Sequence, residues 1–159
     1  MKGLLLDTNV VSELRKPESK RNPQVTEWAR GKDFRNSYLS VITITELKVG
    51  ILRAKRRDLI QSEILRKWLE SNILDNYKGR ILNIDTEIAQ YAAALQVPDK
   101  HQLADAYIAA TALAHKLTLA TRNVEDFLDT GVQIENPWEP GNTLLKLSED
   151  YGQGEYPDE

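Results

Sequence analysis

Short apolar runs alternate with longer segments of helical periodicity along most of this chain. The run at residues 3–7 holds three successive leucines and is too short for a helix, so it predicts a strand buried on both faces. Similar runs predict further strands at 38–42, 80–85, 117–121 and 132–135. Helical patterns cover 9–15, 23–30, 45–55, 59–76, 86–96 and 103–116. This alternation predicts an α/β fold in which a parallel sheet is sandwiched between helices.

Composition narrows the class of protein. A chain of 159 residues is expected to form one domain, and its apolar runs fall short of the roughly 20 residues that span a membrane. The first strand follows Met1 so closely that we expect no signal peptide. The absence of cysteine excludes disulfides and thiolate metal sites and favours a cytoplasmic location. With only two histidines, a metal would be held by oxygen, which favours Mg²⁺ or Mn²⁺.

Charge is distributed unevenly. Residues 139–159 contain six acidic residues against Lys146 alone, a charge of −5, whereas residues 1–138 carry 20 basic and 18 acidic residues, a charge of +2. We therefore predict a folded domain over 1–138 and an acidic C-terminal tail over 139–159 that is extended or partly disordered. If several carboxylates of the domain cluster, its remaining surface is basic and suits a polyanionic substrate.

Four acidic residues stand where a strand ends or a helix begins. Asp7 follows the first strand, Glu46 the second and Asp126 the fourth, while Asp105 lies in the first turn of the alanine-rich helix. In open α/β sheets, ligands bind beyond the carboxyl ends of the strands. The four acids are therefore expected to meet in one crevice.

Two of these acids have a purely structural alternative at a helix start. Asp7 could cap the helix that follows, although Thr8 or Asn9 could serve equally well. The stretch 43–46 has the spacing of a capping box that ends in Glu46, and Gly50, one turn later, would leave space beside that carboxylate. Both alternatives remain open from the sequence.

The other acids also have two interpretations. Asp105 could be stabilised by the helix dipole, but its downstream neighbours are apolar, and an unpaired buried carboxylate costs several kcal/mol. Asn123 and Asp126 could each supply an oxygen ligand or act as turn and cap residues.

A cluster of basic residues lies at the end of the helix 45–55 and consists of Arg53, Lys55, Arg56 and Arg57. This cluster is either simply solvated or in contact with phosphates, and Arg122 is better placed to contact a phosphate.

Clustered carboxylates indicate a particular chemistry. Their mutual repulsion raises their pKa values unless a cation compensates. Mg²⁺ binds through one or two carboxylates, waters and phosphate oxygens, and it can activate water for phosphodiester hydrolysis. The chain has no Gly-x-Ser-x-Gly motif, no cysteine and no phosphate-binding Gly-x-x-x-x-Gly-Lys loop. The pattern therefore favours a metal-dependent nuclease over a hydrolase that uses a nucleophilic triad.

Several motifs occur together in the order typical of one family. They are Asp7-Thr8-Asn9, Thr43-Ile44-Thr45-Glu46-Leu47, Asp105-Ala106-Tyr107-Ile108-Ala109-Ala110-Thr111-Ala112, Leu119-Ala120-Thr121-Arg122-Asn123-Val124-Glu125-Asp126-Phe127 and Ile134-Glu135-Asn136-Pro137-Trp138. In this order the chain resembles a PIN-domain ribonuclease, and most closely the VapC and FitB-like toxins of type II toxin–antitoxin systems. The resemblance runs from residue 3 to about residue 138.

The resemblance implies a PIN-like three-layer fold and a Mg²⁺- or Mn²⁺-dependent endoribonuclease that cuts tRNA or rRNA. By this resemblance Asp7 and Asp105 are the principal metal ligands and Glu46 is the third acid. Many PIN domains carry a fourth acid where this chain has Asn123, so either Asp126 replaces it or three acids suffice. Thr8, Asn9, Arg122 and Asn123 would contact substrate.

The resemblance also implies partners. Such proteins form homodimers, are inhibited by a small cognate antitoxin, and reach operator DNA only through that antitoxin; no membrane is involved.

Two rival interpretations of the function remain. An aspartyl phosphotransferase is disfavoured because Asn9 stands where such enzymes have a second aspartate. A catalytically degenerate PIN fold that binds RNA or protein is suggested by Asn123.

Overall fold

A five-stranded parallel sheet forms the centre of the molecule, of which the computed structural model describes residues 2–141. The strand order is β3-β2-β1-β4-β5, so β1 lies between β2 and β4, and all neighbouring strands are parallel. The strands are β1 (Leu4–Leu6), β2 (Ser37–Ser40), β3 (Ile81–Leu82), β4 (Thr118–Ala120) and β5 (Ile134–Glu135). The predicted parallel α/β sheet is confirmed, although each strand is shorter than its apolar run.

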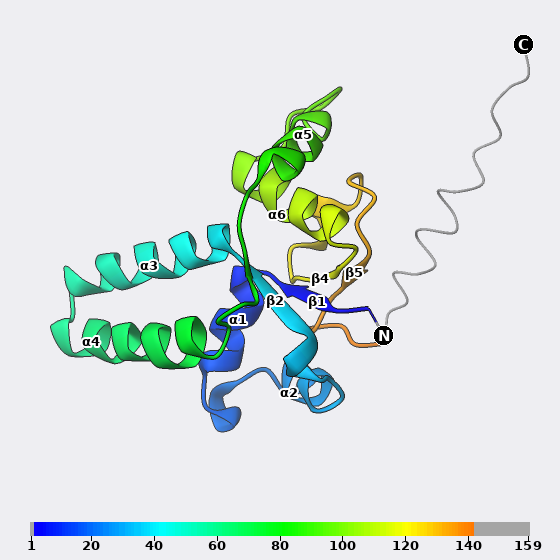
Figure 1. Ribbon diagram of the computed structural model, residues 1–159. Helices are drawn as coiled ribbons and strands as arrows, with labels where there is room; N and C mark the ends of the chain where they lie inside the picture. Colours follow the sequence, from blue (N-terminus) through cyan, green and yellow to red (C-terminus); the bar gives the residue numbers. More distant parts are fainter. Residues whose placement is uncertain (1, 142–159) are drawn as a thin grey trace, which may run out of the picture.

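Helices cover both faces of this sheet (Figure 1). They are α1 (Thr8–Arg15), α2 (Pro23–Arg30), α3 (Val41–Lys55), α4 (Leu59–Trp68), α5 (Thr86–Ala94) and α6 (Leu103–Ala114). A π-helical segment, Leu69–Asp75, continues α4, and short 3-10 helices occur at Glu18–Lys20, Phe34–Asn36 and Val124–Phe127. In Figure 1, α3 and α4 form a hairpin that projects from the sheet, whereas α5 and α6 pack together on the other side.

Successive leucines of β1 point to opposite faces, as the two-residue period of a strand requires. Leu4 and Leu6 pack in a core formed largely by residues of α1 to α4. Leu5 packs in a second core with Ile108 of α6 and with Phe127. Both faces of β1 are therefore buried, which fixes the position of the residue that follows the strand.

The start of α3 corrects one expectation. The apolar run 38–42 predicted a strand and the helix was expected from Thr45, but β2 ends at Ser40 and α3 begins at Val41. The Ser40 hydroxyl accepts the backbone N–H of Ile42 and so caps the helix at this point. The capping-box interpretation of Glu46 is therefore wrong, because Glu46 lies in the second turn of α3.

Most of the predicted acidic tail, residues 142–159, lies outside the described part of the chain. The expectation that the tail is extended or partly disordered stays a prediction. Among residues 2–141, no helix has both the length and the apolar character needed to cross a bilayer.

Gly3, at the entry to β1, has close neighbours, because a Cβ atom there would lie 3.1 Å from the backbone oxygen of Asn36 and would require a small shift. A Cβ atom there would stand 2.9 Å from both Asn36 Oδ1 and Leu117 Cδ2. We expect Gly3→Ala to destabilise the fold by about 1–3 kcal/mol through overpacking, measured by urea unfolding. The matched control is Gly50→Ala in α3, where a Cβ meets no heavy atom within 4 Å and should stabilise the helix by about 0.5–1 kcal/mol. Equal effects of the two changes would contradict this packing.

Candidate active site

Asp7 is held at the carboxyl end of the central strand by three hydrogen bonds. Its side chain is 5% exposed. Thr121 Oγ1 donates to Asp7 Oδ2 at 2.8 Å, the Thr8 backbone N–H donates to Oδ1 at 2.8 Å, and Asn9 Nδ2 donates to Oδ2 at 3.2 Å. Asp7 is also the N-cap of α1. The structural alternative for Asp7 is therefore correct, and its carboxylate, which caps α1, lies at the carboxyl end of the sheet.

Burial dominates the electrostatics of Asp7. Loss of water raises the pKa of its carboxyl group, the hydrogen bonds from Thr121, Thr8 and Asn9 lower it in part, and the charge of Asp126 raises it again. Within residues 2–141, no lysine, arginine or histidine forms an ion pair with Asp7. The ionised form of Asp7 thus depends on neutral hydrogen-bond donors.

Glu46 is linked to the end of β1 through Thr8. Thr8 Oγ1 donates to Glu46 Oε1 at 2.8 Å and lies 3.2 Å from the hydroxyl oxygen of Thr43, a buried residue one turn before Glu46. The space beside Glu46 expected from Gly50 is present, since a Cβ at Gly50 would be free of contacts. The α3 acid is therefore oriented by α1, the helix that Asp7 caps.

Asp105 completes an electrostatic cluster of four acids. Partial burial is the main cause that raises its pKa to about 6, and the charges of Asp126, Asp7 and Glu46 raise it further, while His101 opposes them. These acids come from α6, the 3-10 helix Val124–Phe127, the end of β1 and α3. Asp105 thus lies near enough to the other three acids that the sequence predicted for their charges to raise its pKa.

The donor set is made of oxygen and fits a hard divalent cation. In the part of the chain that the structure describes, no three Asp, Glu or His side chains stand close enough to enclose an ion by themselves. Mg²⁺ does not require such a cage, because it binds proteins through one or two carboxylates and keeps several waters. Burial is the main cause that raises the pKa values of Asp7 and Asp105, and repulsion between the acids adds to it; a cation beside both carboxylates would offset these effects.

Arg122 and Asn123 follow β4 beside this cluster. The Arg122 backbone N–H donates to Asn9 Oδ1 at 3.1 Å, and the Asn123 backbone N–H donates to Thr121 Oγ1 at 3.0 Å. The Arg122 guanidinium lies over the indole ring of Trp138, 5.2 Å from its centroid. The sequence did not predict a site role for Thr121 or Trp138. Thr121, like Asp7, comes directly after a buried strand, and this position is the pattern that could have identified Thr121 as a site residue.

The remaining candidates are placed but not assigned a role by the structure. Thr8 and Asn9 use their side chains to hold Glu46 and Asp7, and substrate contact by them stays a prediction. The basic residues of 53–57 are exposed at the turn between α3 and α4, at the projecting end of the hairpin (Figure 1). Their contact with phosphates also stays a prediction.

Two hollows flank the acids. One, of about 440 Å³, is lined by Arg122, Asn123, Val124, Glu125, Asp126, Asn136 and Glu139. The other, of about 400 Å³, is lined by Lys100, His101, Gln102, Asp105, Glu125, Asp126, Leu128 and Asp129. Asp126 and Glu125 line both, so these hollows meet at the 3-10 helix. Of the four acids, Asp126 lines both hollows and Asp105 lines one, whereas Asp7 and Glu46 line neither.

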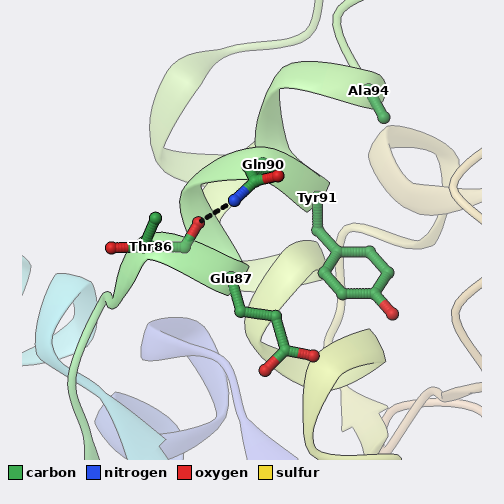
Figure 2. A pocket seen from close by; sticks show the side chains of 5 residues that line it. All are labelled: Thr86, Glu87, Gln90, Tyr91 and Ala94. Atoms are coloured by element: carbon green, nitrogen blue, oxygen red, sulfur yellow. Dashed lines mark hydrogen bonds between the residues drawn. The ribbon is translucent and has the colours of Figure 1, made fainter.

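A further hollow of about 500 Å³ lies along α5 and has a different character (Figure 2). Its lining residues all belong to α5, and Figure 2 shows Glu87 and Tyr91 extending from the same side of this helix. None of the four clustered acids lines it. The chemistry predicted from the sequence therefore belongs to the crevice at the sheet edge.

Comparison with known proteins agrees with this arrangement. Residues 4–132 match the PIN domain family. Toxin FitB of Neisseria gonorrhoeae is 38% identical over 143 residues, covering 85% of this chain and 98% of the relative. VapC ribonuclease Y4jK of Sinorhizobium fredii is 39% identical over 145 residues, covering 86% and 99%. The solved structure of FitAB bound to the IR36 DNA fragment superposes with a TM-score of 0.75 at 35% identity, covering 86% of this chain and 96% of the matched chain. The predicted family and three-layer fold are confirmed.

The raised pKa of Asp105 predicts how stability depends on pH without metal. Because its folded pKa is about 6 rather than 3.8, ionisation costs the folded state stability as pH rises from about 4 through 6. Asp105→Asn should therefore raise the free energy of unfolding in EDTA at pH 7.5 by about 1 kcal/mol, after allowance for solvent screening, and by less at pH 4. Urea unfolding at both pH values measures this.

The control is Asp75→Asn, which changes an exposed aspartate on the π-helical segment. It should leave the pH dependence of stability unchanged. A loss of stability in Asp105→Asn at both pH values would instead mark Asp105 as a structural carboxylate.

Proposed function

Because this chain belongs to the PIN domain family, we propose that it is the toxin of a VapBC- or FitAB-type toxin–antitoxin system and acts as a Mg²⁺- or Mn²⁺-dependent endoribonuclease. The observation that carries the proposal is the raised pKa of two carboxyl groups, those of Asp7 and Asp105, which burial raises first and the charge of Asp126 raises further. Perturbed carboxylates in a crevice are typical of functional sites. Relatives named as ribonuclease and as toxin support the same activity.

In this proposal Asp7 and Asp105 would hold the metal ion directly, and Glu46, the third acid, would reach it through a bound water. When bound, the ion supplies an activated water and stabilises negative charge on the phosphoryl group. Thr121, Thr8 and Asn9 hold Asp7 in place by hydrogen bonds, and Thr8 also fixes Glu46, which would orient a water activated by the ion. Asp126 acts from the outer side of the cluster, in place of the acid that many relatives carry at the position of Asn123. Arg122 offers a positive charge to the phosphate that is cut.

Partners follow from the same assignment. We propose a small cognate antitoxin, a homodimer of the toxin, and contact with operator DNA only through the antitoxin. The α3–α4 hairpin supports a protein partner because it exposes four large apolar side chains, those of Leu52, Leu59, Ile60 and Ile64, at 52–77%. The substrate is cytoplasmic tRNA or rRNA.

Loss of one central carboxylate should stop cleavage without unfolding the protein. We expect Asp7→Asn and Asp105→Asn each to lower the rate of RNA cleavage by more than about 100-fold, since even residues that only support metal ligands contribute 10- to 100-fold. The assay uses purified, antitoxin-free protein with total tRNA and rRNA, in Mg²⁺, in Mn²⁺ and in EDTA. Circular dichroism confirms that the variants are folded.

Discrete cuts that need metal and vanish in both variants support the ribonuclease. A folded, metal-supplied wild-type protein that cuts no RNA would favour the alternative, a degenerate PIN fold that binds RNA or protein. Asn123→Asp, which restores the acid found in many relatives, would then be the variant in which to look for recovered cleavage.

The hydroxyl of Thr121 donates to Asp7 and also accepts the backbone N–H of Asn123, so we expect its loss to disturb the site. Thr121→Val removes the donor to Asp7 Oδ2 and leaves a buried carboxylate less well satisfied, so we expect a 10- to 100-fold loss of cleavage and a weaker apparent affinity for Mn²⁺. Thr121→Ser retains the hydroxyl and should retain most activity. If Thr121→Val and Thr121→Ser cut RNA equally fast, the hydrogen bond to Asp7 has no role in catalysis.

A further inference from the structure

We propose that the 440 Å³ hollow beside Arg122 is a nucleobase pocket that selects the base next to the phosphate that is cut. This proposal rests on the proposed function for the substrate, which is RNA, but it does not depend on the metal chemistry. Its volume lies in the range of about 300–1,000 Å³ typical of small-molecule pockets. Its lining combines the planar guanidinium of Arg122 with side-chain amides and carboxylates. Such groups can stack on a nucleobase and form hydrogen bonds with it.

The first component is a stacking platform. The Arg122 guanidinium lies over the indole of Trp138, and Arg122 is an exposed residue that lines the hollow. The backbone N–H of Arg122 donates to the side-chain oxygen of Asn9, and the amide nitrogen of Asn9 donates to Asp7. These hydrogen bonds fix the position of the platform relative to Asp7. Single-stranded RNA is bound by stacking its bases on aromatic rings and on guanidinium planes.

The second component is a set of polar groups at the edge of the platform. Among the described residues, the side-chain amide of Asn123 has no hydrogen-bond partner, and Asn136 uses only its Oδ1, which accepts the Trp138 backbone N–H at 3.0 Å. Glu125 and Asp126 add carboxylate oxygens to the same hollow. Amide N–H groups can donate to a base carbonyl, and the carboxylates can accept from a base amino group.

The third component is the place of the hollow in the crevice. Asp126 lines it and also perturbs both Asp7 and Asp105. A phosphate held at the acid cluster would therefore place the base of an adjacent nucleotide at the Arg122 platform. The carboxylate acceptors favour bases with an exocyclic amino group, which adenine and cytosine have and uracil lacks.

The experiment measures binding separately from cleavage. Full-length Asp7→Asn protein in Mg²⁺ is titrated against fluorescently labelled five-nucleotide oligomers of adenylate, cytidylate or uridylate, and Kd is read from anisotropy. We expect oligo-uridylate to bind most weakly. Arg122→Lys, which keeps the charge but loses the flat face, should weaken binding of oligo-adenylate about 5- to 100-fold. Glu125→Ala, which removes one of the carboxylate acceptors, should reduce the preference for adenylate and cytidylate over uridylate.

The matched control is Arg57→Lys, the same exchange at the exposed turn between α3 and α4, which should change Kd by less than about twofold. Trp138→Leu, compared with Trp138→Phe, tests the lower layer of the platform, with circular dichroism as the check on folding.

Equal Kd values for Arg122→Lys and Arg57→Lys, equal binding of the three oligomers, or no binding of any oligomer would each overturn the pocket. Base-selective binding that depends on Arg122, in a protein whose wild type cuts no RNA, would support the pocket while the ribonuclease assignment fails. Metal-dependent cutting of RNA, with no effect of Arg122→Lys on oligomer binding, would support the ribonuclease assignment and overturn the pocket.

Discussion

The buried carboxylate of Asp7 is the constraint on which the site depends. It lies at the end of β1, the central strand, whose leucines are packed on both faces, so the backbone that carries Asp7 has little freedom to move. The donors that keep it ionisable come from two segments: Thr8 and Asn9 begin the next helix, and Thr121 directly follows the neighbouring strand β4. The same residues reach onward to Glu46 and to the backbone of Arg122. Positioning of Asp7 therefore positions the crevice.

This arrangement sets stability against function. Burial and like charges raise the pKa values of Asp7 and Asp105, so at neutral pH the metal-free fold holds carboxylates that are less stable than in water. A structural role alone would favour asparagine at Asp105, since its neighbours in α6 are largely buried and apolar. A carboxylate at this place is advantageous when a cation joins the cluster. The cost in stability and the capacity for catalysis thus have one physical origin.

Much of this could be predicted from the sequence because the relevant patterns are local. The run Leu4–Leu6 and the alanine-rich helix predicted two buried elements. The acid beside each of them predicted where the site lies. The start of α3 was misplaced because Tyr38–Ile42 is apolar enough for a strand, and the cap formed by Ser40 outweighs that preference. The partnership of Thr121 with Asp7 joins residues 114 positions apart, and the contact of Arg122 with Trp138 likewise depends on tertiary packing. No local pattern encodes either contact.

The most direct test of the central claim is the effect of Mn²⁺ on thermal stability, measured as Tm at pH 7.5 and at pH 4.5 for the wild type and for Asp105→Asn. A cation that binds only the folded protein raises Tm, and binding requires ionised carboxylates. The account predicts a clear rise in Tm for the wild type at pH 7.5, a much smaller rise at pH 4.5, and little or none in Asp105→Asn. An unchanged wild-type Tm at pH 7.5, or an equal rise in Asp105→Asn, would contradict it.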